Sequence, residues 1–353
     1  MNEIILNAHI HTRYSDGMKT HREIAKIAAA LDLDAVLISD HNVFPQDVDG
    51  YYKFGSKRIL VVIGEEIHNV NRIPQKNHLL AFGIDKSYTK YASNPQILVD
   101  RITEAGGLTF LAHAYDPALP AFGDDDLSWV DWNVSGFSGI ELWNNLSEIK
   151  VRYRNKLQAF FYAIFPSFLA LEPPSPIRKK WDQLLLQGFP LTAIGGSDAH
   201  TLPYKIGPFN IRVFPYSYHF RSISNHLLLE NPMSGEAKKD QKAILATMKI
   251  GRLFIANDQV FSSRGFRCWV ERNNCRYQMG EKVSFESGLI LRATLPAKAD
   301  CFILNNGKRI QAFRNVNRIN FPIMSEGIYR IECYRRFRIR KRGWIFTNPF
   351  YLS

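Results

Sequence analysis

The chain has 353 residues, a formal net charge of +12 and 46% hydrophobic residues. This length suffices for one large α/β domain and a smaller second one. It contains neither a long apolar run nor a low-complexity segment, and no basic signal-peptide stretch precedes Ile4, so we expect a soluble cytoplasmic protein without a transmembrane segment.

The first predicted strand, Ile4–Ala8, runs directly into two histidines, His9 and His11. Residues two apart on a strand face the same way, so both imidazoles can address one point, most simply a metal ion. The turn Ser15-Asp16-Gly17 follows and can fold a carboxylate back over the strand end.

Further strands alternate with helical patterns, and histidines or acids stand beside most of these strands. A capping box at Thr20–Glu23 and an Asn94-Pro95 cap begin two of the helices. The strands and their polar neighbours are 35–38 with Asp40-His41, 59–63 with Glu65-Glu66, 79–82 preceded by His78, 108–111 with His113, 139–144, and 191–196 with Asp198-Ala199-His200.

This alternation predicts parallel βα units, with candidate ligands gathered at the carboxyl ends of the strands. We therefore expect a barrel-like α/β fold whose active face is that rim. His78 departs from the rule because it precedes its strand. It reaches the same rim only if that strand runs the other way, or if the residue lies in the incoming loop.

An aromatic stretch at 160–169 is predicted to pack against the barrel. The alternative is an interfacial helix on a membrane surface, and the stretch is too short to span a membrane. After a Lys-rich helix at 236–250, short β-rich runs with turn signals predict a small antiparallel sandwich.

The last third of the chain holds all the excess positive charge, with 19 basic and 7 acidic residues from Gly251 onward. Its basic run at 335–342 predicts a half-exposed strand near a sheet edge, and contact with a phosphate backbone or an anionic surface is the second interpretation. The four cysteines predict free buried thiols, with a Cys268–Cys275 disulfide as the alternative.

In order, residue type and placement, these motifs resemble those of the polymerase and histidinol phosphatase (PHP) family of metal-dependent phosphoesterases over about residues 1–215. Asn7-Ala8 and Ala114 depart from the family pattern at positions that supply no ligand. The segments 139–144, 181–184 and 344–351 further resemble the branch that includes carbamate-ester hydrolases, in which a β domain follows the barrel.

The resemblance implies a distorted (βα)7 TIM-like barrel over residues 1–250, with a helical aromatic insertion at about 150–180, and a small antiparallel β-sandwich-like domain over 251–353. It also implies two or three divalent metals. His9, His11, Glu66 and Asp198 would hold the first, Asp16, His41 and His200 the second, and Glu66, His78 and His113 the third. Such mixed imidazole and carboxylate ligands suit Zn²⁺, Mn²⁺ or Fe²⁺ better than Mg²⁺ or Ca²⁺.

The expected activity is hydrolysis of a small phosphomonoester or phosphodiester by a metal-bound hydroxide, with Glu66, Asp198 and His200 as catalytic residues. Glu65 competes with Glu66 for the bridging position, Asp40 is expected to orient a neighbour, and His68 is expected to contact substrate. The alternatives are a carbamate or carboxylic ester hydrolase, a nuclease, and a polyanion-binding module that uses the basic C-terminal domain. His21, His219 and His226 are interpreted as structural, and the oligomeric state is left open.

Overall fold

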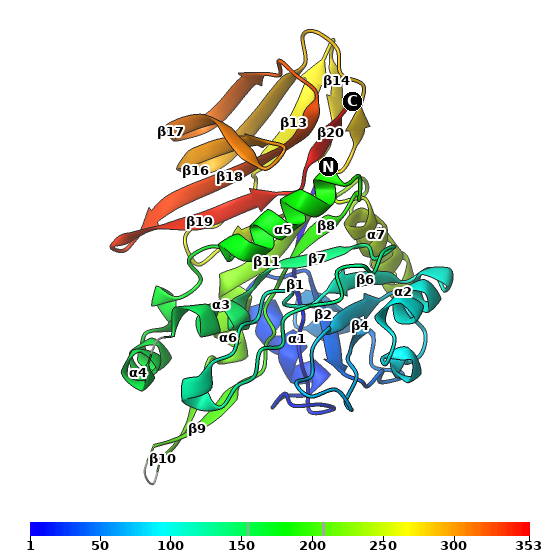
Figure 1. Cartoon of the computed structure of the whole chain (residues 1–353), viewed down its shortest axis with the longest axis vertical. Helices are drawn as coiled ribbons and strands as arrows, with labels where there is room; N and C mark the ends of the chain where they lie inside the picture. Colours follow the sequence, from blue (N-terminus) through cyan, green and yellow to red (C-terminus); the bar gives the residue numbers. More distant parts are fainter. Residues whose placement is uncertain (154, 207–208) are drawn as a thin grey trace.

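A computed structural model describes residues 1–153, 155–206 and 209–353, and it has a mixed α/β architecture (Figure 1). Seven strands lie side by side in the order β1 (Asn2–Ala8), β2 (Ala35–His41), β4 (Lys57–Ile67), β5 (Leu79–Phe82), β6 (Leu108–Leu111), β7 (Gly139–Asn144) and β8 (Thr192–Gly196). Beyond β8 the backbone returns to β1, with Ser197 N donating to Ala8 O at 2.9 Å and His11 N to Ala199 O at 3.1 Å. These hydrogen bonds close the seven strands into a ring.

The ring is not parallel throughout. Strands β1, β2 and β4 are parallel, as are β6, β7 and β8, but β5 is antiparallel to both β4 and β6. No helix joins β4 to β5, so the chain turns back directly, and β3 (Gly50–Phe54) forms a second antiparallel hairpin with β4. Because β5 is reversed, its first residues lie at the same rim as the carboxyl ends of β4 and β6. His78, which precedes β5, therefore reaches the rim that carries the other candidate ligands.

Helices accompany the strands of the ring. They are α1 (His21–Ala30), α2 (Pro95–Glu104), α3 (Asn145–Arg152), α4 (Lys156–Ile164), α5 (Ser175–Leu186), α6 (Tyr216–Ser222) and α7 (Ala237–Lys249), with short turns η1 (Thr89–Tyr91), η2 (Pro120–Phe122) and η3 (Pro166–Phe168). Both predicted starts are confirmed, since Thr20 and Glu23 form the capping box of α1 and the Asn94 side chain accepts from the first turn of α2.

The aromatic stretch packs only in part as predicted, since Leu169 is buried but α4 is largely exposed. Helices α3 and α4 project from the ring (Figure 1), and α4 leaves several large apolar side chains exposed. These are Leu157, Phe160, Phe161 and Ile164, followed by Phe165. Only one side of α4 has a partner cluster, to which Tyr162 and Ala163 contribute. Within the described ranges, no helix has the length and apolar character needed to cross a membrane.

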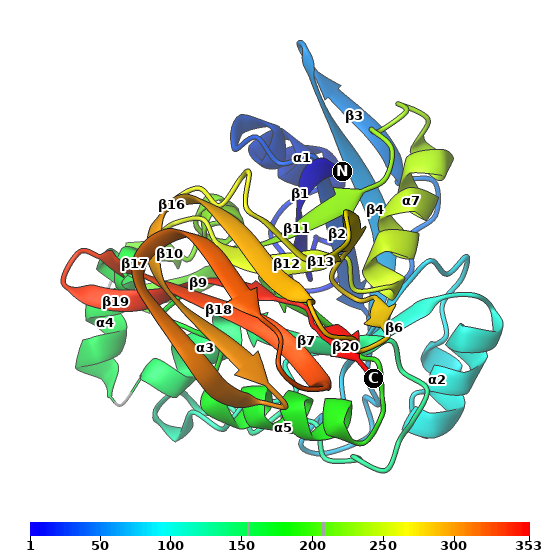
Figure 2. The same cartoon turned by 90° about the horizontal axis from the view of Figure 1, so that it is seen from above.

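The C-terminal strands are mostly antiparallel, as expected, and the sheet runs into them without a break. Strand β11 (Ile223–Leu229) pairs with β1 and with β12 (Leu253–Asn257), and β12 pairs in turn with β19 (Arg340–Thr347). The remaining strands are β13 (Arg267–Arg272), β14 (Cys275–Tyr277), β15 (Lys282–Val283), β16 (Ile290–Asn305), β17 (Lys308–Pro322), β18 (Gly327–Phe337) and β20 (Phe350–Leu352), and a separate hairpin joins β9 (Leu202–Ile206) to β10 (Phe209–Val213). Figure 2 shows the C-terminal strands from above, close to α5.

Packing between α5 and the C-terminal strands is dense. The run Trp344-Ile345-Phe346 is buried, and the Phe346 ring meets Trp143 edge-on with centroids 5.5 Å apart. Phe346 also shares a core cluster with Trp181 of α5, so C-terminal side chains complete the core around β7. Charged groups join the same parts, since Asp182 of α5 accepts two hydrogen bonds from the buried Arg330.

Glu332 lies at the centre of that charged network. Its carboxylate accepts from Arg330 at 2.6 Å and from Arg309 at 2.8 Å, while Arg178 of α5 lies 3.5 Å away. Burial alone would raise the pKa of Glu332, but the charges of Arg330 and Arg178 and the hydrogen bonds lower it to about 2. The ionised carboxylate therefore stabilises the contact between α5 and β18.

The basic run at 335–342 is a hairpin rather than one strand. It comprises the end of β18, a turn at which Arg338 has φ of 53°, and the start of β19, with Phe337 opposite Arg340. Arg342 is buried and donates to Leu169 O at 2.8 Å. All four cysteines are free thiols; Cys275 is exposed and the other three are buried.

Candidate metal centre

Glu66, at the end of β4, is the centre of a cluster of histidines. Its buried carboxylate contacts five imidazoles, more than any single hydrogen-bonded carboxylate needs. Oε2 lies 2.9 Å from His9 Nε2, 3.2 Å from His11 Nε2 and 3.2 Å from His41 Nδ1, and Oε1 lies 2.7 Å from His78 Nδ1 and 3.0 Å from His113 Nε2. The ends of three strands, β1, β2 and β6, supply four of these rings, and the reversed start of β5 supplies the fifth.

Two aspartates extend the cluster toward His200. Asp198 Oδ1 lies 3.2 Å from His11 Nε2 and 3.5 Å from His200 Nδ1. Asp16, half-exposed at the mouth, lies 3.7 Å from His41 Nε2 and 4.0 Å from His200 Nε2. All nine candidate ligands predicted from the sequence therefore lie in one continuous group.

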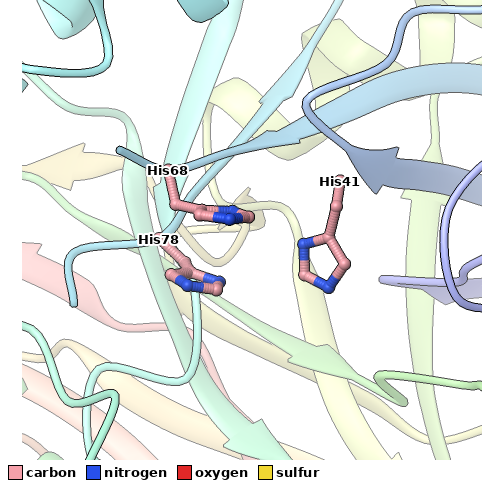
Figure 3. A group of neighbouring side chains, drawn as sticks. All are labelled: His41, His68 and His78. Carbon is pink, nitrogen blue, oxygen red and sulfur yellow. The ribbon is translucent and has the colours of Figure 1, made fainter. Parts of the chain in front are cut away.

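His68 was expected to contact substrate, but its ring lies within the histidine cluster itself. Figure 3 shows its ring beside that of His78, with His41 facing both. The rings of His68 and His78 stack with centroids 4.2 Å apart, and ligand nitrogens of the three histidines lie within 4.8 Å of one another. His68 is thus placed to ligate a metal as well as to face a substrate.

Backbone strain accompanies the cluster. His9, His113 and Asp198 adopt positive φ angles of 61°, 26° and 51°. Non-glycine residues seldom occupy this region, and those that do are concentrated at functional sites. Each of these residues follows a strand, where the left-handed turn redirects its side chain into the ring.

The ionisation of the cluster favours a bound cation. Burial would lower the pKa of His11, but hydrogen bonds to Asp198 and Glu66 raise it to about 10. Burial would raise the pKa of Glu66, but the charges of His9, His41 and His78 hold it well below its usual range. Burial lowers the pKa of His41 to about 4 and that of His68 to about 3. The carboxylates therefore retain protons on the deepest rings, protons that a metal would displace.

The donor set also fits a metal by its hydrogen bonding. Some buried ring nitrogens have no hydrogen-bond partner among the described residues, including His78 Nε2 and His113 Nδ1. Buried polar nitrogens without partners are costly, and a coordinated cation would satisfy them. A donor set that mixes imidazole and carboxylate is one that divalent metal ions accept in proteins.

Glu141, inside β7, is a member of the site that the sequence reasoning did not single out. Its buried carboxylate lies 2.9 Å from His9 Nδ1, and it accepts from His113 N at 2.6 Å and from Asn144 Nδ2 at 2.9 Å. With Nδ1 bonded to Glu141, the Nε2 atom of His9 is left for a metal. The available signal was a carboxylate inside an otherwise apolar strand.

Gly196 is required beside Glu141. A Cβ added at Gly196 would lie 1.5 Å from Glu141 Oε1, a distance that no packed atom tolerates. The glycine at the end of β8 therefore makes the space that the Glu141 carboxylate occupies.

The two other acids considered from the sequence point elsewhere. Glu65 accepts from Ser87 Oγ at 2.6 Å and from Thr89 Oγ1 at 2.8 Å, outside the histidine cluster, which leaves Glu66 at the centre. Asp40 accepts from both the backbone and the side chain of Thr12 at 2.7 Å and from Ser15 Oγ at 2.7 Å. It therefore holds the loop that carries Asp16, as the expected orienting role requires.

The remaining histidines lie outside the cluster. His226 lies between Glu3 at 2.7 Å and Asp258 at 2.9 Å, and His219 bonds to Asn145 at 3.0 Å. His21 is buried in the first turn of α1. These contacts agree with their structural interpretation.

A cavity of about 900 Å³ opens from the cluster. Asp16, His41, His68, His78 and His200 are among the side chains that line one part of it, and apolar residues of α3 and α4 line another. A small ligand can therefore approach the candidate metal ligands directly.

Comparison with known proteins identifies several similar chains. An uncharacterized protein from Methanocaldococcus jannaschii is 29% identical over 127 residues, which are 33% of this chain and 71% of that protein. A two-domain protein from Bacteroides vulgatus containing a predicted PHP-like metal-dependent phosphoesterase covers 99% of this chain and 95% of its own, at 13% identity and a TM-score of 0.45. A lesion-specific endonuclease from Pyrococcus furiosus covers 78% of this chain and 64% of its own, at 13% identity and a TM-score of 0.36.

The family comparison covers the first part of the cluster. The segment that matches a family model, residues 7–101, contains Glu66, the carboxylate at the centre of the cluster, together with His9, His11, His41 and His78. The expected resemblance is thus confirmed at the level of a domain family: residues 7–101 of this chain match the model of the PHP domain.

Proposed function

We propose that this chain is a metal-dependent hydrolase, and specifically a phosphoesterase that cleaves a small phosphomonoester or phosphodiester. The observation that carries the proposal is the Glu66 carboxylate within hydrogen-bonding range of five imidazoles, inside a segment that matches the PHP domain. A hydrogen-bonded core has no need for so many titratable groups at one point, whereas a multinuclear metal site does.

The proposed ligands fall into three sets, and Glu66 bridges the first and the third. His9, His11, Glu66 and Asp198 would hold one metal, Asp16, His41 and His200 a second, and Glu66, His78 and His113 a third, with His68 an additional candidate ligand. When bound, two or three such metals supply a Lewis acid and a hydroxide near neutral pH, so that no serine or cysteine nucleophile is required. Zn²⁺, Mn²⁺ and Fe²⁺ fit this donor set.

The chain's own groups have distinct tasks in this scheme. Glu141 orients His9 through the 2.9 Å contact at Nδ1, and Asp40 fixes the loop that carries Asp16. Asn42 accepts from His68 N at 3.0 Å and holds that residue at the cavity wall, where it would contact the leaving group or the phosphoryl oxygens. Such support keeps a reactive site within the narrow geometry that catalysis needs.

The fold assignment that accompanies this function is also a proposal. The closed ring of seven strands supports a distorted (βα)7 barrel over residues 1–250, in which β5 is reversed. Residues 251–353 would form the second domain, although β12 pairs across that boundary with β11. We propose that the chemistry belongs to the first part, because the residues that line the cavity all precede Tyr216.

A substrate panel tests the function. Protein reconstituted separately with Mn²⁺, Zn²⁺ and Fe²⁺ is assayed on an aryl phosphate, a bis-aryl phosphodiester, an aryl carbamate, an aryl ester and a single-stranded oligonucleotide. We expect turnover of one of the phosphoesters. Turnover of only the carbamate or the carboxylic ester would replace the phosphoesterase with the alternative hydrolase, and cleavage of only the oligonucleotide would indicate a nuclease.

Variants of the proposed ligands separate metal binding from other roles. Glu66→Ala, Asp198→Ala and His200→Ala should each abolish activity and lower the bound metal, because loss of a ligand leaves the cation undercompensated. Metal content is measured beside the rate for each variant. Unchanged metal stoichiometry in all three would refute the ligand assignment.

A further inference from the structure

The cavity beside the histidine cluster has two chemically different parts. Toward the strand ends it is lined by imidazoles and carboxylates, while α3, α4 and the turn η2 supply an apolar wall. That wall includes Leu119, Leu146, Ile149, Tyr153, Phe160 and Phe214. A substrate recognised only through a charged head would have no use for this second part.

The apolar wall begins next to the candidate metal ligands and runs away from them. Asn144, immediately before α3, donates to Asp198 Oδ2 at 3.3 Å. From there Leu146 and Ile149 lie about one turn apart on α3, Tyr153 follows at the end of the helix, and all three line the cavity. At a rise of 1.5 Å per residue, the seven steps from Leu146 to Tyr153 extend roughly 10 Å. This is a stripe suited to an extended hydrocarbon chain.

The charges of the lining disfavour a polyanion. Among the described residues that line the cavity, Lys150 is the only Lys or Arg, and its Nζ is already paired with the buried Asp116 at 2.9 Å. Asp16, Asp124 and Asp198 add negative charge to the same cavity. Among the described residues of this wall, a nucleic-acid backbone would find no free cationic side chain to neutralise its phosphates.

From these observations we propose that the substrate is an amphiphile whose ester group lies at the histidine cluster and whose alkyl or acyl chain lies along the α3 and α4 wall. The inference rests on the proposed hydrolase function and adds the substrate class. Burial of a hydrocarbon chain is favourable in proportion to the area removed from water, so affinity should increase with chain length until the wall is covered.

The apolar surface continues out of the cavity. On other faces of α4, Leu157, Phe161 and Ile164 are 78%, 44% and 52% exposed, and none of them lines the cavity. The hydrocarbon chain that contacts this wall could come from an amphiphile dispersed in water or from one embedded in a bilayer. The test therefore includes a separate arm for each source.

The first measurement is binding of non-hydrolysable alkylphosphonates with ethyl, butyl and octyl chains to the full chain loaded with Mn²⁺, by calorimetry. A fully buried methylene raises affinity about fourfold and a half-buried one about twofold. We expect the octyl compound to bind at least tenfold more tightly than the butyl compound. Equal affinity for the ethyl and octyl compounds would overturn the proposal.

Two adjacent phenylalanines of α4 provide a matched pair of variants. Phe160 lines the cavity and is 46% exposed, whereas Phe161 does not line it and is 44% exposed. Phe160→Ser should weaken octylphosphonate binding at least threefold and leave ethylphosphonate unchanged, and Phe161→Ser should change neither. Equal effects of the two substitutions would place the chain outside the cavity and refute the assignment.

Binding and turnover together distinguish an error in the substrate class from an error in the proposed hydrolase function. Turnover of an aryl phosphate without any dependence of binding on chain length refutes the amphiphile alone. Binding that depends on chain length, without turnover of any phosphoester, supports the amphiphile and refutes the phosphoesterase.

The source of the amphiphile is resolved by one further comparison. Binding of octylphosphonate below its micelle-forming concentration supports uptake of a dispersed molecule. Co-sedimentation of the protein with phosphatidylcholine vesicles only when they contain hexadecylphosphonate supports uptake from a bilayer. Absence of both would overturn the proposal.

Discussion

Replacing Glu141 by glutamine would test whether this buried carboxylate orients the metal ligands. One oxygen faces His9 Nδ1, and the other accepts from His113 N and Asn144 Nδ2. A glutamine has one acceptor and one donor at these positions, so either orientation of its amide leaves a mismatch. If the nitrogen faces His113 N, two donors oppose each other; if it faces His9 Nδ1, the imidazole proton must move to the nitrogen that faces the proposed metal.

The size of the effect follows from these contacts. Hydrogen bonds to a charged group contribute about 1.5–3 kcal/mol each, and loss of a group that orients a metal ligand lowers metal affinity by about tenfold to a hundredfold. That decrease corresponds to about 1.4–2.7 kcal/mol of binding free energy. The assay is a competition titration against a chromophoric chelator, with the hydrolytic rate measured on the same samples.

Glu65→Gln is the matched control. Glu65 is as deeply buried as Glu141, but it bonds to Ser87, to the backbone of Tyr88 and to Thr89 rather than to any candidate ligand. The Glu65→Gln substitution should therefore lower the melting temperature of the protein without changing its affinity for metal. An unchanged metal affinity in Glu141→Gln, or an equal loss in both variants, would refute the orienting role.

Three further predictions concern the same fold. Gly196→Ala should reproduce the loss of metal affinity of Glu141→Gln, because the new Cβ would occupy the site of the Glu141 carboxylate; wild-type affinity by chelator competition would contradict this. The pKa of Glu332 is lowered to about 2 from an ordinary 4.5. The ionised carboxylate therefore contributes at most about 3 kcal/mol to the free energy of unfolding, a contribution that is present above pH 4.5 and lost as the pH falls toward 2. Glu332→Gln should therefore be less stable at pH 7 and lose less stability over that acid range, as measured by denaturant unfolding at each pH; parallel curves would contradict it. Truncation after Ile250 removes β12 and Phe346, so we expect an aggregated or unfolded protein by size-exclusion chromatography and thermal unfolding. A monomer as stable as the full chain would contradict the packing of the C-terminal strands against the rest of the protein.

Much of the local structure could be predicted from the sequence because local interactions decide it. The capping box at Thr20 and the Asn94 cap form as expected, since each satisfies backbone groups within its own first turn. The strands before His41, Glu66 and His113 also form where the apolar runs indicate.

Pairing between distant segments was harder to predict, because hydrophobic pattern alone does not specify a strand's direction. The sequence left two routes open for His78, and the antiparallel pairing of β5 with β4 and β6 decided between them. The basic run at 335–342 alternates like a strand, yet the pairing of Phe337 with Arg340 makes it a hairpin. Similarly, α4 has an apolar sequence typical of a packed helix, but it projects from the ring and leaves Phe160 and Phe161 half-exposed.

The sequence by itself determined which chemical groups are available and where they stand along the chain: histidines and acids at successive strand ends. Only the tertiary structure decided which of them meet. Adjacent residues on a strand face opposite sides, so the strand's orientation in the sheet sends Glu66 into the cluster and Glu65 toward Ser87. Glu141 joins the site because β7 and β8 lie side by side and Gly196 leaves room for its carboxylate, a contact between residues 55 positions apart that no local pattern encodes.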